Sequence, residues 1–244
     1  MRELLLDVGR QAAPLFDKIR IEGLDTGTRV EAYTDDKMLF LFADLKDVVP
    51  EFAGEFGISN LALLRGLLDF ASYKTEQARL QVSRTVRDGI EYVAELQFAD
   101  ANGGHTRFKT INPRMIGERA HIANINWGVS VTPSKAKLTE VTQLTSMLSQ
   151  VDQHFSVSYE DHTLFLAIGG KGASSHQASV ALANDVEPVS LPPRMVFRAP
   201  HFLAVLKNAG NLPCTIRFAK EGVGGILIET EHGAYNYILR GTES

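Results

Sequence analysis

The sequence has a single cysteine, Cys214, among its 244 residues and no long apolar run. One cysteine excludes an internal disulfide and fits a reducing cytoplasm, and its strand-like neighbours predict a small buried side chain. No apolar run approaches the roughly 20 residues of a membrane span. Acids at Glu3 and Asp7 flank the first leucines, so the N-terminus does not resemble a secretory signal. These absences predict a cytoplasmic protein without a membrane partner.

The chain also lacks an excess of positive charge, because its formal net charge is −4. Residues 1–120 carry 16 basic and 19 acidic side chains and the remainder carries 9 and 10, so neither half is a basic domain. Simple DNA-binding modules are usually basic. A protein of this composition that contacts DNA must therefore gather its positive charge on one surface.

Recognisable catalytic spacing is missing as well. The seven histidines show no metal-ligand spacing with acids or with the cysteine. There is no Gly-x-Ser-x-Gly elbow and no Cys-His pair in a known local context. The glycine-rich loop after Ile168 runs into a strand, whereas a phosphate-binding loop opens a helix. The sequence therefore indicates a binding protein rather than an enzyme, with no cofactor and no metal.

What the sequence does contain is one order of elements that occurs twice. In the second half, Ser134 caps an amphipathic helix, and two β-rich runs follow around a Glu-Asp-His turn. A further strand, a short helix from Pro200 to its stop at Gly210 and three alternating strands complete this half. The apolar face of the long helix is expected to comprise Leu138, Val141, Leu144, Leu148 and Val151.

The first half gives the same order of a helix, a strand pair, a short helix and a three-stranded meander. Its short helix is expected to open at Ser59 or Asn60. Pro14 fits a helix only in the first turn, so the first helix is predicted to begin near Gln11. Its apolar face would comprise Ala12, Leu15, Phe16 and Ile19.

The two copies differ in length. Leu61 and Phe202 open the short helices 141 positions apart, whereas Phe108 and Tyr237 in the closing strands are 129 positions apart. The difference of 12 predicts extra residues in the first half, around residues 73–90.

The fold class that follows is α+β, with two similar domains at residues 1–111 and 134–244 and a connector at residues 112–133. The connector shows no sustained helical or strand period, which predicts an irregular segment. Its apolar residues, which include Ile122, Ile125 and Trp127, indicate that it lies against a sheet rather than free in solvent.

Three stretches resemble a known family. The C-terminal GVGGILIETEHGAYNYILRG is similar to the closing hairpin of PCNA-like sliding clamps, in particular the trimeric clamps of tailed phages. GISNLALLRGLL resembles the short helix of their first domain and KLTEVTQLTSML the long helix of their second. The resemblance extends over nearly the whole chain in the order of elements.

This resemblance implies the DNA clamp fold and a homotrimeric ring in the cytoplasm of a bacterial host. Helices on one face of the antiparallel sheets would line a channel around double-stranded DNA, which is held without sequence specificity. Enclosure explains how an acidic protein can hold DNA, because the duplex is threaded rather than tightly bound. The implied partners are a DNA polymerase and a clamp-loader ATPase complex.

The residues expected to contact phosphates lie on the predicted helices, and none of them needs to read a base. The third helix would add an uncharged polar face of Thr142, Gln143, Ser146, Ser149 and Gln150. Ordinary solvated helix faces are the alternative interpretation for each residue. The basic candidates are Arg10 and Lys18 on the first helix, Arg65 on the short one, Lys135 and Lys137 opening the third, and Lys207 ending the fourth.

The family binds partner peptides in an apolar pocket beside the connector, which would place Ile122, Ile125 and Trp127 at its border. A lone tryptophan can instead anchor a loop to the core. Two other classes of protein stay open at this point. One is a two-domain enzyme or ligand-binding protein with a site between the halves, and the other is a monomeric or dimeric interaction protein that forms no ring.

Overall fold

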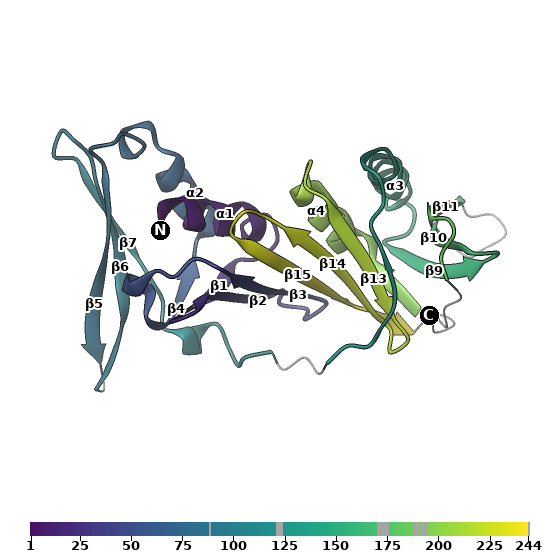
Figure 1. The fold of residues 1–244 in the computed structure, drawn as a ribbon, viewed down its shortest axis with the longest axis horizontal. Helices are drawn as coiled ribbons and strands as arrows, with labels where there is room; N and C mark the ends of the chain where they lie inside the picture. Colours follow the sequence, from purple (N-terminus) through teal and green to yellow (C-terminus); the bar gives the residue numbers. More distant parts are fainter. Residues whose placement is uncertain (88, 121–123, 170–175, 188–190, 192–194, 244) are drawn as a thin grey trace. The chain divides into compact units, whose positions relative to one another are not determined.

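The computed structural model of the chain (Figure 1) describes residues 1–244 except 88, 121–123, 170–175, 188–190, 192–194 and 244. It divides into two compact units, each a mixed α+β body with antiparallel sheets. Unit 1 comprises Met1–Thr34, Leu41–Ala120 and Thr230–Tyr235, and unit 2 comprises Asp35–Phe40, His121–Glu229 and Asn236–Ser244.

Unit 1 begins with a helix and contains two groups of paired strands. The strand order is β4-β1-β2-β3 in one group and β5-β6-β7 in the other. Figure 1 shows helices α1 and α2 packed together on one face of the first group. The elements are α1 (Arg2–Ala12), β1 (Lys18–Leu24), β2 (Gly27–Tyr33), β3 (Leu39–Leu45), β4 (Gly54–Ser59), α2 (Leu61–Asp69), β5 (Arg79–Arg87), β6 (Ile90–Ala99) and β7 (His105–Lys109), with short 3-10 turns at Pro50–Phe52, Ala71–Tyr73 and Pro113–Met115.

The expected position of the first helix is wrong. Helix α1 spans Arg2–Ala12 and ends before Pro14, because proline has no N–H to donate and its ring clashes with the preceding turn. The apolar residues through which α1 packs on unit 1 include its own leucines, Leu4–Leu6. Ile19 and Ile21, which are both 0% exposed, belong to strand β1, where Arg20 between them is buried as well.

Unit 2 has the corresponding architecture. Its strand orders are β11-β10-β9-β12-β16 and β15-β14-β13-β8, and helices α3 and α4 pack against each other. The elements are β8 (Trp127–Val131), α3 (Lys135–Leu148), β9 (His154–Glu160), β10 (Thr163–Gly169), β11 (Gln177–Ala183), β12 (Met195–Arg198), α4 (Ala199–Ala209), β13 (Cys214–Ala219), β14 (Val223–Glu229), β15 (Gly233–Arg240) and β16 (Thr242–Glu243).

The last part of the predicted irregular connector is a strand, so that prediction is wrong for β8. This strand pairs antiparallel with β13, with Val131 opposite Ile216 and Val129 opposite Phe218. Only Val129 of the strand is buried. Five residues with a single buried position give too short a period to recognise in the sequence.

The repeat of elements is confirmed, and it is more regular than the sequence indicated. After the first helix, each unit has four strands, a short helix and three strands. The order β4-β1-β2-β3 in unit 1 matches β12-β9-β10-β11 in unit 2, and β5-β6-β7 matches β13-β14-β15. Strands β8 and β16 have no counterpart among the described residues of unit 1.

The extra residues of the first copy lie between α2 and β7, in the region that the sequence spacing predicted. Strand β7 begins 36 positions after Asp69 ends α2, whereas β15 begins 24 positions after Ala209 ends α4. A longer connection after α2 and longer strands account for the difference. Strands β5 and β6 have nine and ten residues, and β13 and β14 have six and seven.

The cores are built from aromatic and aliphatic side chains, with Tyr235, Phe56 and Phe202 among the largest that are fully buried. Cys214 is 1% exposed, as its strand context predicted. Burial raises the pKa of its thiol to about 11. Among the described residues, no helix is both long and apolar enough to cross a membrane.

Candidate functional site

A group of cations lies on the helical face of unit 1. Gly9 of α1 faces α2 closely, since a Cβ atom there would lie 3.7 Å from the Cβ of Arg65. Lys74 Nζ lies 2.9 Å from Asp69 Oδ1, and Arg65 Nε lies 4.0 Å from Asp69 Oδ2. The hydrogen bond and charge of Lys74, together with the charges of Arg10 and Arg65, lower the pKa of Asp69. Two cations thus contact one carboxylate and the charge of Arg10 also acts on it, so positive charge exceeds negative charge in this group.

Two details of this group differ from the sequence prediction. Lys74 was missed, because it follows α2 and its approach to Asp69 depends on the 3-10 turn Ala71–Tyr73. Lys18 was placed on a helix, but it is the exposed first residue of β1. It pairs in register with Ser59, two residues before α2 begins. Lys18 therefore lies at the strand end next to this helix rather than on a helix face.

The predicted cations of unit 2 lie on its two helices. Ser134 accepts a hydrogen bond from the Lys137 N–H at 3.3 Å and so caps α3 as predicted. Lys135 is exposed in the first turn, and Lys207 is exposed in the last turn of α4. Lys137 pairs with Glu140 at 2.6 Å, which partly neutralises it.

Helix α3 buries little of its surface within unit 2. Val141 and Thr145 are its only buried residues, although Leu138, Leu144 and Leu148 are half-buried. Val151 lies beyond the helix and is 52% exposed, so its expected place on the apolar face is wrong. The polar residues Thr142, Gln143, Ser146, Ser149 and Gln150 are all half-buried or exposed. The helix thus presents a broad face with few charges.

The connector residues predicted to bind a partner have different surroundings. Ile122 lies outside the described residues, and Ile125 is half-buried. The ring of Trp127 lies against β14, since a Cβ at Gly225 would be 2.5 Å from it. The guanidinium carbon of Arg217 lies 4.4 Å from the ring centroid, a cation–π contact. Trp127 therefore anchors β8 to its sheet, which is the second of the two interpretations considered from the sequence.

The beginning of the connector is fastened to unit 1 by Arg20, a contact that the sequence did not reveal. Arg20 is 5% exposed on β1 and donates hydrogen bonds to the carbonyl oxygens of Gly117 at 2.6 Å and Pro113 at 3.3 Å. Its guanidinium also lies 2.8 Å from Glu55 and 3.5 Å from Glu31.

Arg119 extends this network from the connector itself. It lies 2.9 Å from Glu22, 3.2 Å from Glu55 and 3.6 Å from Glu31. The hydroxyl of Tyr33 donates to the carbonyl of Ile116 at 2.7 Å. The segment therefore lies against the strands of unit 1, as its apolar composition indicated, and a cleft of about 700 Å³ opens beside it. We call Arg20, Arg119, Glu22, Glu31 and Glu55 the connector clasp.

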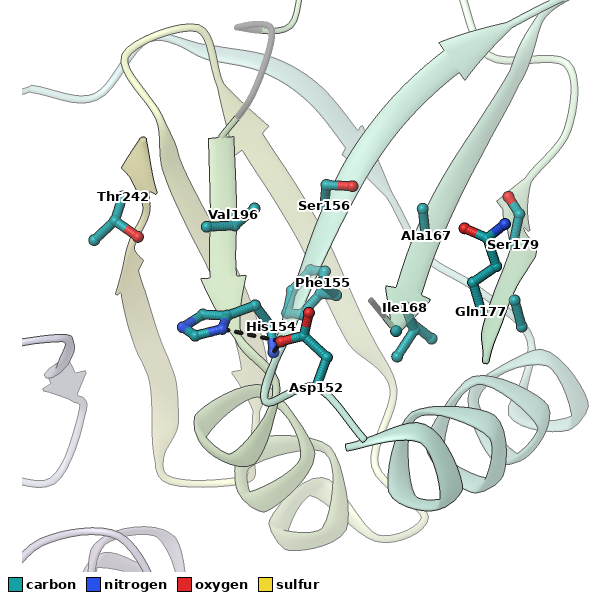
Figure 2. A pocket seen from close by; sticks show the side chains of 12 residues that line it. Asp152, His154, Phe155, Ser156, Ala167, Ile168, Gln177, Ser179, Val196 and Thr242 are labelled. Atoms are coloured by element: carbon teal, nitrogen blue, oxygen red, sulfur yellow. Dashed lines mark hydrogen bonds and ion pairs between the residues drawn. The ribbon is translucent and has the colours of Figure 1, made fainter. Parts of the chain in front are cut away.

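A second hollow, of about 760 Å³, lies in unit 2 and is drawn in Figure 2. Its lining comes from β9, β10, β11, β12 and β16, mostly with small or uncharged side chains. His154 Nδ1 lies 3.1 Å from Asp152 Oδ1 at its rim. Within the described residues, no serine or cysteine forms a hydrogen bond with this pair, and no three metal-binding side chains come together. The hollow thus has no assembled catalytic group.

Two copies of an α+β unit, with paired helices on antiparallel strands, define the DNA clamp fold. No family model matches the sequence, and neither does any curated protein. The fold does match solved structures. The PCNA from Thermococcus kodakaraensis has a TM-score of 0.71 at 10% identity, over 99% of this chain and 97% of that chain.

The PCNA of A. fulgidus, in a structure with the C-terminal region of FEN-1 bound, gives a TM-score of 0.69 at 15% identity. That match covers 100% of this chain and 96% of the other. The chain therefore has the PCNA clamp fold, and the fold class predicted from the sequence is confirmed.

Proposed function

We propose that this protein is a DNA sliding clamp, a scaffold without catalytic activity that encircles duplex DNA and tethers a polymerase. The observation that carries the proposal is the end-to-end match to the PCNA fold, over 99% and 100% of the chain. In this reading residues 1–111 and 134–244 are the clamp domains and residues 112–133 the connector. A phage origin, suggested by the resemblance in the C-terminal hairpin, belongs to the same proposal.

The ring would consist of three subunits joined head to tail, since a heterologous contact whose rotation closes generates a ring. Two free strand edges support this arrangement. Within the described residues, β7 is at one edge of the strands of unit 1 and β11 is at one edge of those of unit 2. Pairing of β7 with β11 of the next subunit would remove both edges, which otherwise invite uncontrolled association.

The DNA would face the helices. Arg10, Arg65 and Lys74 supply positive charge in unit 1, and Lys135 and Lys207 supply it in unit 2. Lys18 and Lys137 are the weaker candidates, the first because it is on a strand and the second because Glu140 pairs with it. A sparse charge pattern suits sliding, because strong phosphate contacts would hold the clamp at one position.

The proposed partners are a DNA polymerase and a clamp loader, bound through the connector near Ile122 and Ile125, where Trp127 would fix the adjoining strand β8 in place. The PCNA of A. fulgidus binds the C-terminal region of FEN-1, which supports peptide docking as the mode of recognition. A tethered polymerase experiences its template at an effective concentration on the order of mM. Processivity then rises without any change in the chemical step.

A two-domain enzyme or ligand-binding protein is the weaker alternative, because the Asp152–His154 pair has no third catalytic group hydrogen-bonded to it in the described part of the chain. Solution mass separates the clamp from a protein that forms no ring. Three chains of 26.8 kDa give a particle of about 80 kDa. Light scattering that finds only the monomer across a wide concentration range would refute the trimer.

The DNA-facing surface is tested by reversing charge on α3. Changing Lys135 and Lys137 together to glutamate should slow loading onto circular DNA at least about ten-fold, since each reversal replaces a phosphate contact by repulsion. The solution mass should stay that of the trimer. Lys46→Glu plus Lys220→Glu, at two exposed positions outside the helices, is the control that makes the same change of net charge elsewhere. Equal loading rates of the parent, the Lys135 and Lys137 variant and the control would show that α3 does not face the DNA.

A further inference from the structure

The repeat reveals a strand of unit 2 that has no counterpart among the described residues of unit 1. In unit 2, β13 is paired on both sides, with β14 and with β8. The counterpart of β13 in unit 1 is β5, and within the described residues it pairs with β6 alone. Figure 1 shows β5 at the margin of its three strands. The position that β8 fills beside β13 has no described occupant beside β5.

Burial of the two strands differs accordingly. On β13, Cys214 and Ile216 are 1% exposed and Phe218 is 3% exposed. On β5, Leu80 and Val82 are only half-buried and Val86 is 66% exposed. The free edge of β5 therefore lies beside a row of partly exposed apolar side chains, Leu80 and Val82. A further strand could cover this row, as β8 covers β13 in unit 2.

The regular pairing of β5 with β6 ends at a bulge in β6, where Ala94 has no partner opposite it on β5. The register between β5 and β6 shifts between Ser83 and Arg84. Beyond the shift, the Arg84 guanidinium donates to the carbonyl oxygens of Glu51 at 3.0 Å and Ala53 at 2.8 Å, which ties that part of β5 to its own unit. The regular part, Arg79–Ser83, has five residues, the same length as β8.

The polar face beside this edge is positively charged. The regular part of β5 places Arg79 on this face, and it contains no acid. In the register of the three strands, Gln97 stands opposite both Gln81 and Arg107, and Glu95 stands opposite both Ser83 and Lys109. Glu95 pairs with Arg107 and Lys109, so one acid faces two cations. Arg79, at the beginning of the same row, is exposed and adds a third positive charge.

We propose that the Arg79–Ser83 edge binds an extended acidic segment of a partner protein as an added antiparallel strand. Main-chain hydrogen bonds would supply affinity, and alternating side chains would supply specificity, as in other β-augmentation complexes. Apolar residues of the segment would cover the Leu80–Val82 row, and acidic residues would face the row of Arg79. The proposal depends on unit 1 alone and does not rest on ring formation or DNA binding.

The test attaches such a strand covalently to the protein, so that its effective concentration at the β5 edge is high. In unit 2 three residues join β8 to α3, so a strand placed a similar distance ahead of α1 has the equivalent path. The full chain is extended at its N-terminus with Glu-Val-Glu-Val-Glu and a Ser-Gly-Ser linker. Matched extensions replace the glutamates by lysine or the valines by proline. Amide hydrogen exchange is then measured residue by residue.

The acidic extension should slow exchange at Arg79–Ser83 at least ten-fold, the lysine extension should slow it less, and the proline extension should leave it unchanged. Arg79→Glu should remove most of the difference between the acidic and lysine extensions. No protection with the acidic extension would overturn the proposal, and so would equal protection by both charges. In the unextended chain, protection that grows with protein concentration would show that a second copy occupies the edge, which also contradicts it.

Discussion

Replacing Arg20 by alanine is expected to detach the beginning of the connector and to destabilise unit 1. The side chain is 6% exposed and contacts two connector carbonyls and two carboxylates. Its removal leaves Gly117 and Pro113 without this donor and leaves Glu31 and Glu55 with Arg119 alone. The polar groups that lose Arg20 are buried or partly buried, so water cannot replace all of the lost hydrogen bonds and ion pairs.

The magnitude follows from these contacts. Breaking a buried ion pair by removing one partner costs about 3–5 kcal/mol. Arg119 remains 3.2 Å from Glu55 and 3.6 Å from Glu31, and Glu55 is itself 34% exposed, so the lower end applies. A loss of about 3 kcal/mol should lower the midpoint of thermal unfolding by roughly 6–12 °C in a chain of this size.

Arg29 on the neighbouring strand β2 provides a matched control. It also pairs with two carboxylates, Asp44 at 3.1 Å and Glu22 at 3.7 Å, but its side chain is 42% exposed. Surface pairs of this kind contribute about 1 kcal/mol or less. Arg29→Ala should therefore lower the free energy of unfolding by no more than about a third of the loss caused by Arg20→Ala.

The assay combines calorimetry with hydrogen exchange over residues 113–119. Arg20→Ala should speed exchange in this segment before global unfolding, whereas Arg29→Ala should not. Equal destabilisation by the two substitutions, or unchanged exchange in the segment, would show that the connector clasp does not hold the connector.

Two further predictions concern single ionisable groups. Hydrogen bonds from Lys109 and Gln97 lower the pKa of Glu95 below its ordinary value of 4.5. The ionised carboxylate therefore stabilises the fold above pH 4.5, and this stabilisation is lost as the pH falls through the pKa of the folded state. Urea unfolding should thus find Glu95→Gln less stable than the parent at neutral pH, with a gap that closes in acid; a gap that is the same at both pH values would contradict this. Cys214 is buried and its pKa is about 11, so iodoacetamide near neutral pH should label it at least about a hundred-fold more slowly in the folded than in the unfolded chain. Equal rates would place the thiol at the surface.

Much of the architecture could be predicted because its signals are local. Ser134 caps α3, Pro200 and Gly210 delimit α4, and turn residues separate the last three β-rich runs. The first helix failed because Pro14 can open a helix or follow one, and only packing decides. The pattern of the true helix, with Glu3 and Arg10 exposed beside the buried leucines, was present in the sequence and was overlooked.

The candidate site was harder to predict, because its geometry depends on distant residues. Arg20 acts through Gly117, 97 positions away, and no period in the sequence marks that contact. Lys74 acts through a 3-10 turn that brings it back to Asp69. Trp127 could be read as a pocket residue or an anchor, and the decisive neighbours, Gly225 and Arg217, come from other strands. Composition alone could not connect them.

Retention on circular DNA tests the central claim most directly. The protein is loaded on a nicked circle, washed at high salt, and the circle is then cut once by a restriction enzyme. A clamp that encircles DNA should stay on the circle and leave after the cut, because threading does not depend on phosphate contacts. Binding that the salt wash abolishes, or that survives the cut unchanged, would mean ordinary phosphate binding and would contradict the proposed ring.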